Sequence, residues 1–284
     1  MINQIIIDDI GLPVKNIIPV QGGDINESYC LETDLGKYFL KINEANQFPL
    51  LFQKEANGLN ILKTQSLFAI PNVIKHGVSG NRQYLVLDWI EKAVPARDFW
   101  QQFGHKLAAM HQIEQPYFGF NEDNYIGSLT QINTIHQNWE SFFTECRLMP
   151  AVKKLSDAGI FSLQDVRSTE YFGRQLQNIF PKEKPALLHG DLWGGNYMAG
   201  TDGYPVIFDP AVYFGHREMD IGMSLLFGGF SSNVYKYYNE VYPLEKNWQQ
   251  RISFTQLYPL LVHAILFGGH YVHSARNILK KFDV

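Results

Sequence analysis

The sequence predicts an α+β protein with two lobes, a β-rich N-terminal lobe over residues 1–92 and a mainly helical C-terminal lobe over residues 93–284. Two observations lead to this prediction. Short apolar runs separated by glycine turns fill the first ninety residues, whereas beyond Pro95 the apolar residues recur at helical spacing. The two patterns meet near residues 88–93, where we expect the lobes to be joined.

The composition is that of an ordinary globular protein, with 45% hydrophobic and 18% charged residues. The formal charge is −4, which weighs against partners such as nucleic acid or an anionic membrane. The apolar stretch 257–269 is too short to span a bilayer, and the N-terminus lacks the features of a signal peptide. Cys30 and Cys146 are expected to be buried, reduced thiols. We therefore expect a cytoplasmic protein, and the sequence carries no prediction of its oligomeric state.

The N-terminal lobe is expected to alternate strands with glycine turns. Leu35-Gly36 and Gly80-Asn81 are each a turn between two apolar runs and so predict hairpins. Leu50, Leu51, Leu59 and Leu62 before Pro71 suit an amphipathic helix. In order, we expect strands over 16–21, 27–33 and 37–42, a helix over 49–66, and strands over 72–78 and 83–90.

The C-terminal lobe is expected to be mostly helical. Phe99, Phe103, Leu107 and Met110 fall on one face of a helix over residues 96–113. Between the helices lies a polar, glycine-rich segment, 186–210, in which Ala186–Leu188 and Val206–Phe208 resemble short strands. Further helices are expected over 133–157, over 165–180 and from about 217 to 281.

The segment 187–210 contains four polar residues that suit phosphoryl transfer: His189, Asp191, Asn196 and Asp209. This reaction needs a carboxylate for the acceptor hydroxyl and oxygen ligands for Mg²⁺. Kinase catalytic loops place the base Asp five residues before a metal-binding Asn, and a second metal-binding Asp follows at the end of a strand. Asp191, Asn196 and Asp209 reproduce this order. We predict Asp191 as the catalytic base and Asn196 and Asp209 as Mg²⁺ ligands, although Asp, Asn and Gly are also common turn residues.

Gly190 and Pro210 distinguish this segment from that of protein kinases. Gly190 stands where protein kinases have an Arg that pairs with a phosphorylated activation loop, and Pro210 follows Asp209 in place of Phe-Gly. These differences favour a small-molecule kinase.

The motif His-Gly-Asp-Leu-Trp-Gly-Gly-Asn at 189–196 resembles the signature of the fructosamine kinase (ketosamine kinase) family, within the protein-kinase-like and aminoglycoside-phosphotransferase-like superfamily. Two further blocks agree with it: residues 117–150, which include Gln131, Trp139 and Arg147, and Gly-His-Arg-Glu-Met-Asp-Ile-Gly-Met-Ser at 215–224. The resemblance extends from about Gly22 to the C-terminus. It implies a bilobal protein-kinase-like fold and use of ATP with Mg²⁺.

In this fold, Gly22 and Gly23 would approach the phosphates of ATP, although a plain β-turn would look similar. Lys41 at the end of its predicted strand can reach the α- and β-phosphates. Lys37, which lies at the turn, is the alternative candidate for this role. The resemblance implies that Glu55 pairs with Lys41, whereas alone it would be read as a solvated helix charge. It further implies that backbone groups of Asp88 and Ile90 bind adenine.

Three more residues have expected roles. Asp220 is expected to accept backbone N–H bonds from the catalytic loop, and His111 is expected to be structural. Trp193 is expected to contact the substrate, because an aromatic ring can pack on a sugar and attract an adjacent amine cation. Its alternative role is core packing.

The resemblance implies phosphorylation of the sugar 3-hydroxyl of ketosamines, either small molecules or glycated protein lysines, as a step of deglycation. The alternatives are a kinase of another amino alcohol, such as an aminoglycoside or choline, or a nucleotide-binding pseudokinase. Retention of Lys41, Asp191, Asn196 and Asp209 argues against a pseudokinase.

Overall fold

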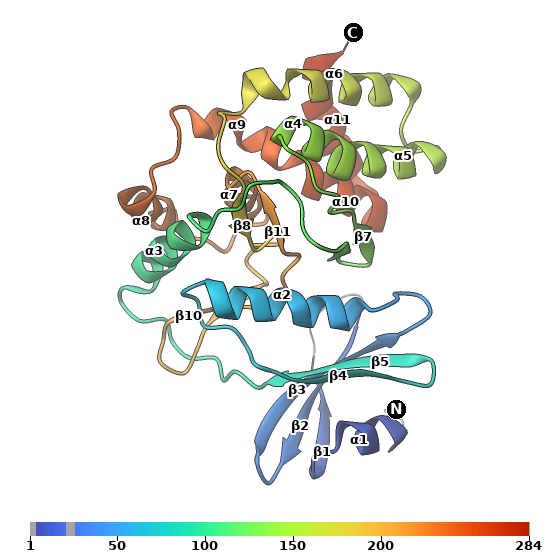
Figure 1. Ribbon diagram of the computed structural model, residues 1–284, viewed down its shortest axis with the longest axis vertical. Helices are drawn as coiled ribbons and strands as arrows, with labels where there is room; N and C mark the ends of the chain where they lie inside the picture. The colour runs from blue at the N-terminus through green and yellow to red at the C-terminus, as the bar shows by residue number, and fades with distance from the viewer. Residues whose placement is uncertain (1–3, 21–25, 284) are drawn as a thin grey trace. The chain divides into compact units, whose positions relative to one another are not determined.

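The computed structural model describes residues 4–20 and 26–283. The chain forms two compact units (Figure 1). The first unit contains residues up to Gln102 and the segment Tyr197–Pro210, and the second contains Phe103–Asn196 and residues from Ala211 onward. None of the described helices combines the length and apolar character that crossing a membrane requires.

The first unit is built on a five-stranded antiparallel sheet in the order β1-β2-β3-β5-β4. The predicted hairpins around Gly36 and Gly80 are confirmed, and both glycines have a positive φ, of 129° and 63°. The elements are α1 (Gln4–Ile10), β1 (Val14–Pro19), β2 (Glu27–Thr33), β3 (Gly36–Glu44), α2 (Leu51–Gln65), β4 (Val73–Ser79) and β5 (Arg82–Asp88).

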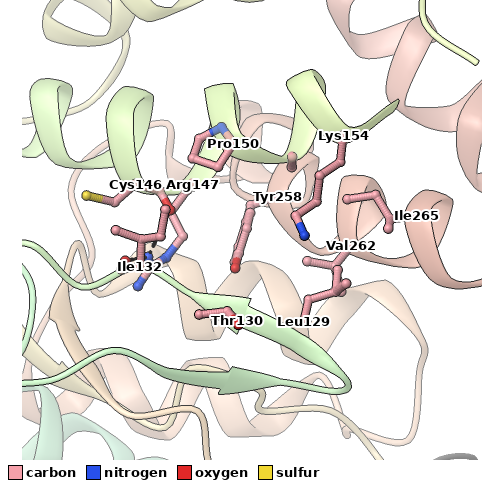
Figure 2. A pocket seen from close by; sticks show the side chains of 11 residues that line it. Leu129, Thr130, Ile132, Cys146, Arg147, Pro150, Lys154, Tyr258, Val262 and Ile265 are labelled. Atoms are coloured by element: carbon pink, nitrogen blue, oxygen red, sulfur yellow. Dashed lines mark hydrogen bonds between the residues drawn. The ribbon is translucent and has the colours of Figure 1, made fainter. Parts of the chain in front are cut away.

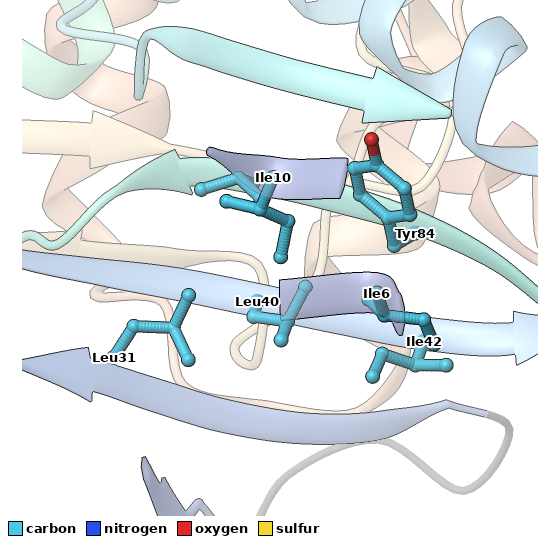
Figure 3. Packing of buried hydrophobic residues seen from close by; sticks show 7 residues of the cluster. Ile6, Ile10, Leu31, Leu40, Ile42 and Tyr84 are labelled. Carbon is cyan, nitrogen blue, oxygen red and sulfur yellow. The ribbon is translucent and has the colours of Figure 1, made fainter. Parts of the chain in front are cut away.

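The two faces of this sheet are covered by different helices. Ile6 and Ile10 of α1, an unpredicted helix, pack on a cluster that includes Leu40 and Ile42 of β3 (Figure 3). Because side chains alternate along a strand, Lys41 points to the opposite face. That face is covered by α2, which packs against β4 and β5. The alternation therefore places one lysine of a buried strand beneath α2.

A short hairpin from later in the sequence completes the first unit. Its strands are β9 (Tyr197–Ala199) and β10 (Pro205–Ile207). The N–H of Ile207 donates to the carbonyl of Ala69, and the N–H of Ala93 donates to the carbonyl of Ala199. These bonds fix the position of the hairpin, which ends two residues before Asp209.

The second unit is mainly helical, as predicted. The helix α3 (Phe99–His111) begins in the first unit and buries the predicted face Phe99, Phe103, Leu107 and Met110. The elements of this unit after α3 are β6 (Asn124–Ile126), β7 (Leu129–Gln131), α4 (Trp139–Phe142), the π-helix η1 (Phe143–Leu148), α5 (Met149–Asp157), α6 (Leu163–Ile179), β8 (Ala186–Leu188), β11 (Tyr213–Gly215), α7 (Glu218–Leu226), α8 (Asn233–Val241), α9 (Trp248–Thr255), α10 (Leu257–Phe267), α11 (His270–Leu279) and the 3₁₀ turn η2 (Lys280–Phe282).

The helix expected over 133–157 is wrong in its first six residues. The helix begins at Trp139, because the side chain of Asn138 accepts a hydrogen bond from the N–H of Ser141 and caps it. Before it, residues 124–131, for which no helix or strand was expected, form the hairpin β6–β7. Within the long helix, residues 143–148 widen into a π-helix. A local π turn inside an α-helix has no simple apolar period, so the periodicity did not reveal it.

Candidate active site

Lys41 lies in the first unit between two carboxylates. Its side chain is buried, and Nζ lies 2.8 Å from Oε1 of Glu55 on α2 and 2.5 Å from Oδ1 of Asp209. The alternative candidate, Lys37, is half exposed, and its Nζ lies 3.4 Å from Oε1 of Glu91. The structure thus brings together three of the predicted residues, one each from β3, from α2 and from the segment after β10.

The charges of this cluster shift each other's proton affinities. Burial alone would lower the pKa of Lys41, but the charges of Asp209 and Glu55 outweigh burial and raise it. Burial raises the pKa of Glu55 to about 6, and the negative charge of Asp209 adds to this rise against the opposing effect of Lys41. Lys41 is therefore a permanent cation with two competing carboxylate partners.

Asp209 has an unusual backbone for a non-glycine residue. Its φ is 56°, in the left-handed region, which Asp adopts more readily than most residues. Its side chain is 41% exposed, in contrast to 6% for Lys41 and 12% for Glu55. The carboxylate thus reaches Lys41 while remaining partly open to solvent, and such a backbone outlier is typical of a functional position.

In the second unit, Asp191 and Asn196 lie together on one loop. The amide nitrogen of Asn196 donates to the main-chain oxygen of Asp191 at 2.8 Å and to its carboxylate at 3.0 Å. The loop is closely packed at Gly190, whose φ is 82°. A Cβ atom there would lie 2.0 Å from the carbonyl oxygen of Ala211, so only glycine fits. This contact is the physical reason for Gly190 at the position of the protein-kinase Arg.

Asp220 on α7 holds the start of this loop. Its two carboxylate oxygens accept the N–H groups of His189 and Gly190 at 2.8 and 2.9 Å. His111 lies 3.3 Å from the same carboxylate and 2.9 Å from the hydroxyl of Tyr238, and it is fully buried. The predicted bracing role of Asp220 and the structural role of His111 are both confirmed.

Trp193 and its two following glycines form one packing unit. A Cβ atom on Gly195 would lie 2.3 Å from the indole of Trp193, so that ring lies directly over Gly195. A Cβ atom on Gly194 would lie 2.9 Å from the carbonyl oxygen of Gly228. The indole is 39% exposed. The Trp-Gly-Gly sequence therefore allows an accessible indole to lie flat on its own loop.

The structure describes only some of the other residues that were predicted to bind the nucleotide. Gly22 and Gly23 lie outside the described residues. Asp88 is the last residue of β5, and its N–H donates to the carbonyl of Asn72 at 3.0 Å. Ile90 lies two residues beyond the strand, which is shorter than expected.

The loop between α7 and α8 contacts the catalytic loop, and the sequence did not lead us to predict this contact. Gly228 and Gly229 have φ of 75° and 90°, and a Cβ atom on Gly229 would lie 2.9 Å from Cα of Gly194. The sequence does contain a signal for this loop, the glycine pair Gly228-Gly229. Glycine permits a close backbone approach.

A small pocket lies elsewhere in the second unit, between α5, α10 and β7 (Figure 2). Its volume of about 20 Å³ is close to that of one water molecule, and no predicted site residue lines it. Arg147 at its wall is fully buried, donates to the carbonyl of Ile132 and lies 4.2 Å from the ring centroid of Tyr213. We interpret this pocket as a packing defect beside a structural arginine and not as a substrate site.

The residues present suit a magnesium ion. In the described part of the chain, no three His, Cys, Asp or Glu side chains form a metal cluster. Mg²⁺ bound with a nucleotide usually takes one or two hard oxygen ligands from the protein and the others from phosphate and water. The carboxylate of Asp209 and the amide oxygen of Asn196 are donors of this type. With the cation Lys41 and the carboxylate Asp191, the chain contains the groups that phosphoryl transfer to a hydroxyl requires.

Comparisons with known proteins agree with this chemistry. The family model described as fructosamine kinase matches residues 1–283. A probable ketoamine kinase of Enterococcus faecium is 38% identical, covering 98% of this chain and 99% of that protein. A chloroplastic protein-ribulosamine 3-kinase of Oryza sativa subsp. indica is 34% identical over 95% of this chain and 79% of its own length.

Two solved structures are similar to this chain. A presumed fructosamine-3-kinase from Haemophilus somnus superposes with a TM-score of 0.86 at 29% identity, covering 98% of this chain and 95% of the other. A spectinomycin phosphotransferase has a TM-score of 0.60 at 13% identity, covering 98% and 92%. The second likeness shows that the predicted α+β, protein-kinase-like fold is correct.

Proposed function

The chain belongs to the fructosamine kinase family, and from this premise we propose that it is an ATP-dependent kinase that phosphorylates the 3-hydroxyl of ketosamines. Ketosamines are the rearranged adducts of sugars with amines, here of the fructosamine or ribulosamine type. The 3-phosphate promotes loss of the sugar, so the enzyme would act in deglycation. The names of relatives, ketoamine kinase and protein-ribulosamine 3-kinase, support this substrate class.

One observation supports the kinase chemistry most strongly. Asp209 lies 168 residues from Lys41 in the sequence, and yet Nζ of Lys41 lies within 2.8 Å of the carboxylates of both Glu55 and Asp209. A buried lysine held by a helix carboxylate is the arrangement that positions the α- and β-phosphates of ATP in kinases. No purely structural need explains three charges in a mostly buried position, because replacing buried charges with apolar groups is often neutral or stabilising.

We propose the following roles. Lys41 neutralises charge on the α- and β-phosphates, and Glu55 holds Lys41 in place. Asp191 orients the acceptor hydroxyl and accepts its proton as the hydroxyl oxygen attacks the γ-phosphorus and ADP leaves. Asn196 orients Asp191 through its amide nitrogen. Backbone groups of Gly22 and Gly23 approach the phosphates, and those of Asp88 and Ile90 bind adenine.

Asp209 and Asn196 would hold Mg²⁺, which neutralises charge that develops on the phosphate oxygens. Trp193 would contact the acceptor, because its exposed indole belongs to the same loop as Asp191. Since the reaction needs ATP, the proposal includes a cytoplasmic location. The acceptor is a small-molecule ketosamine or a glycated lysine of a protein.

The test is ATP consumption with a panel of ribulosamine, fructosamine, kanamycin-like and choline substrates, followed by NMR assignment of the new phosphate. We expect the highest kcat/KM for a ketosamine and phosphate on its third hydroxyl. A higher kcat/KM for an aminoglycoside or choline would refute the substrate class. Phosphate on another ketosamine hydroxyl would refute the regiochemistry alone, and absence of turnover with every substrate would favour a pseudokinase.

A further inference from the structure

A row of aromatic rings begins at the catalytic loop and runs across the second unit. We define the aromatic row as Trp193, Phe227, His263, Phe267 and Tyr271. The centroid of Trp193 lies 6.0 Å from that of Phe227, which lies 4.5 Å from that of His263. His263 lies 5.0 Å from Tyr271 and 5.5 Å from Phe267. The rings come from the catalytic loop, the end of α7, α10 and α11, so the row exists only in the folded chain.

The row is accessible at both of its ends. Trp193 is 39% exposed and Phe267 is 53% exposed. Between α10 and α11, Gly268 and Gly269 have φ of 64° and 60° with ψ of −141° and −135°. Side-chain-bearing residues avoid this backbone region. A Cβ atom on either glycine would meet nothing within 4 Å, so the glycines leave this part of the surface uncovered beside Phe267 and Tyr271.

The row carries no formal charge. Neither 225–235 nor 252–275 contains an Asp, Glu, Lys or Arg. The ring of His263 donates from Nδ1 to the carbonyl of Pro259 at 2.8 Å, because a carbonyl can only accept. Burial lowers the pKa of His263, and the neighbouring His270 adds to this effect, so the ring is neutral at physiological pH. An uncharged aromatic surface favours an apolar partner and also attracts a single amine cation.

The covalent structure of a ketosamine connects this row to the proposed reaction. In a ketosamine, the 3-hydroxyl and the amine nitrogen are separated by three carbons, so their distance is no more than about 5 Å. Trp193 follows the proposed base Asp191 by two residues, and Gly194 packs on Gly228 and Gly229 beside Phe227. An acceptor whose hydroxyl is at Asp191 therefore has its amine within reach of the start of the row.

We propose that the aromatic row binds the substituent on the amine of the acceptor, and that the enzyme prefers ketosamines whose amine carries a large apolar or aromatic group. This inference rests on the proposed function. It assigns Phe227, His263, Phe267 and Tyr271 as residues that determine specificity. Carboxylate-bearing substituents gain nothing from the row, because it offers no positive charge.

The test compares two fructosamines that differ only in the amine substituent, one made from methylamine and one from benzylamine. We expect the benzyl compound to have a kcat/KM about 10-fold higher or more, the discrimination that a modest apolar contact provides. The Phe267→Ala and Tyr271→Leu variants should each lower this ratio several-fold. Phe267→Tyr keeps the ring and should keep the ratio. Leu163→Ala, at a side chain that is 74% exposed on α6, is the matched control and should also keep it.

Equal kcat/KM for the two fructosamines, or a ratio that Phe267→Ala and Tyr271→Leu leave unchanged, would overturn the inference while the proposed function stands. Failure of the enzyme to phosphorylate either compound would overturn the proposed function and the inference together. Because Phe267 is more than half exposed, its replacement should not prevent folding.

Discussion

Lys41, Glu55 and Asp209 of the first unit are held together by charge, whereas the catalytic loop of the second unit is held mainly by hydrogen bonds to its backbone. In the first unit, Lys41 lies within 2.8 Å of two carboxylates. In the second, Asp220 accepts two backbone N–H groups. The amide of Asn196 donates to Asp191. The first arrangement depends on the balance of charges, and the second depends on the position of the main chain.

This difference predicts different responses to mutation. A charge cluster tolerates small movements but not the loss of its only cation, because two carboxylates are then left uncompensated. A loop held by N–H bonds tolerates loss of net charge but not the loss of acceptors, because buried donors are left unsatisfied. Binding of the nucleotide phosphates should therefore be sensitive to substitutions in the first unit, and the chemical step and the loop's stability to substitutions in the second.

The largest effect is expected for Asp209→Ala. The variant loses a proposed Mg²⁺ ligand and a partner of Lys41, so turnover should fall by about 10³-fold or more and binding of ATP should no longer depend on Mg²⁺. Steady-state kinetics and calorimetric titration with and without Mg²⁺ measure both. Asp202→Ala, at an exposed residue between β9 and β10, is the control. Undiminished affinity for Mg·ATP in Asp209→Ala would contradict the assignment.

The second largest effect is expected for Asp191→Asn. The amide cannot accept the hydroxyl proton, so kcat should fall by about 10²-fold or more while the affinity for Mg·ATP changes little. The measurement is kcat together with the Kd of Mg·ATP, with the exposed Asp157→Asn as a control for loss of one charge. Near-normal turnover would show that Asp191 is not the base. A loss of affinity for Mg·ATP equal to the loss of kcat would show that Asp191 contributes to nucleotide binding as much as to the chemical step.

A smaller effect, on stability, is expected for Asp220→Ala. The side chain is 1% exposed, and its removal leaves two buried N–H groups without their acceptor. The free energy of unfolding should fall by about 2–4 kcal/mol, and Asp220→Asn, which keeps one acceptor oxygen, should lose less. Urea denaturation of both variants measures this. Equal stabilities of Asp220→Ala and the wild type would show that the loop is held by other contacts.

The smallest effect is the pH dependence contributed by Glu55. Its pKa is raised from 4.5 to about 6 in the folded protein, so the folded state binds the proton more tightly than the unfolded chain. The stabilising contribution is therefore complete below pH 4.5 and is lost as the pH rises through 6. Relative to Glu55→Gln, the wild type should lose about 1–2 kcal/mol of stability over this range. Denaturation midpoints of both proteins between pH 4 and 8 test the sign, and parallel profiles would contradict it.

Several parts of the site could be predicted from the sequence because they are local. The five-residue separation of Asp191 and Asn196 lies within one loop, and the short distance between the two side chains follows from it. Lys41 was preferred to Lys37 because Lys37 lies at the turn that begins β3, and in the structure Lys41 is buried whereas Lys37 is half exposed. The bracing role of Asp220 depended on the resemblance of residues 215–224 to the fructosamine kinase family.

Tertiary structure alone decided the features that join distant residues. The periodicity of the sequence contains no information that Asp209 would meet Lys41, which lies 168 residues away, or that its φ would be positive. The helix α1, the hairpin β6–β7 and the π-helix around Arg147 were also missed, since each is stabilised by packing partners far along the chain. The aromatic row is the clearest example. Its rings appear in the sequence as unrelated apolar residues of a loop and three helices, and only the packing of those elements gives them a shared surface, because burial and ring contacts depend on distances in space and not on spacing along the chain.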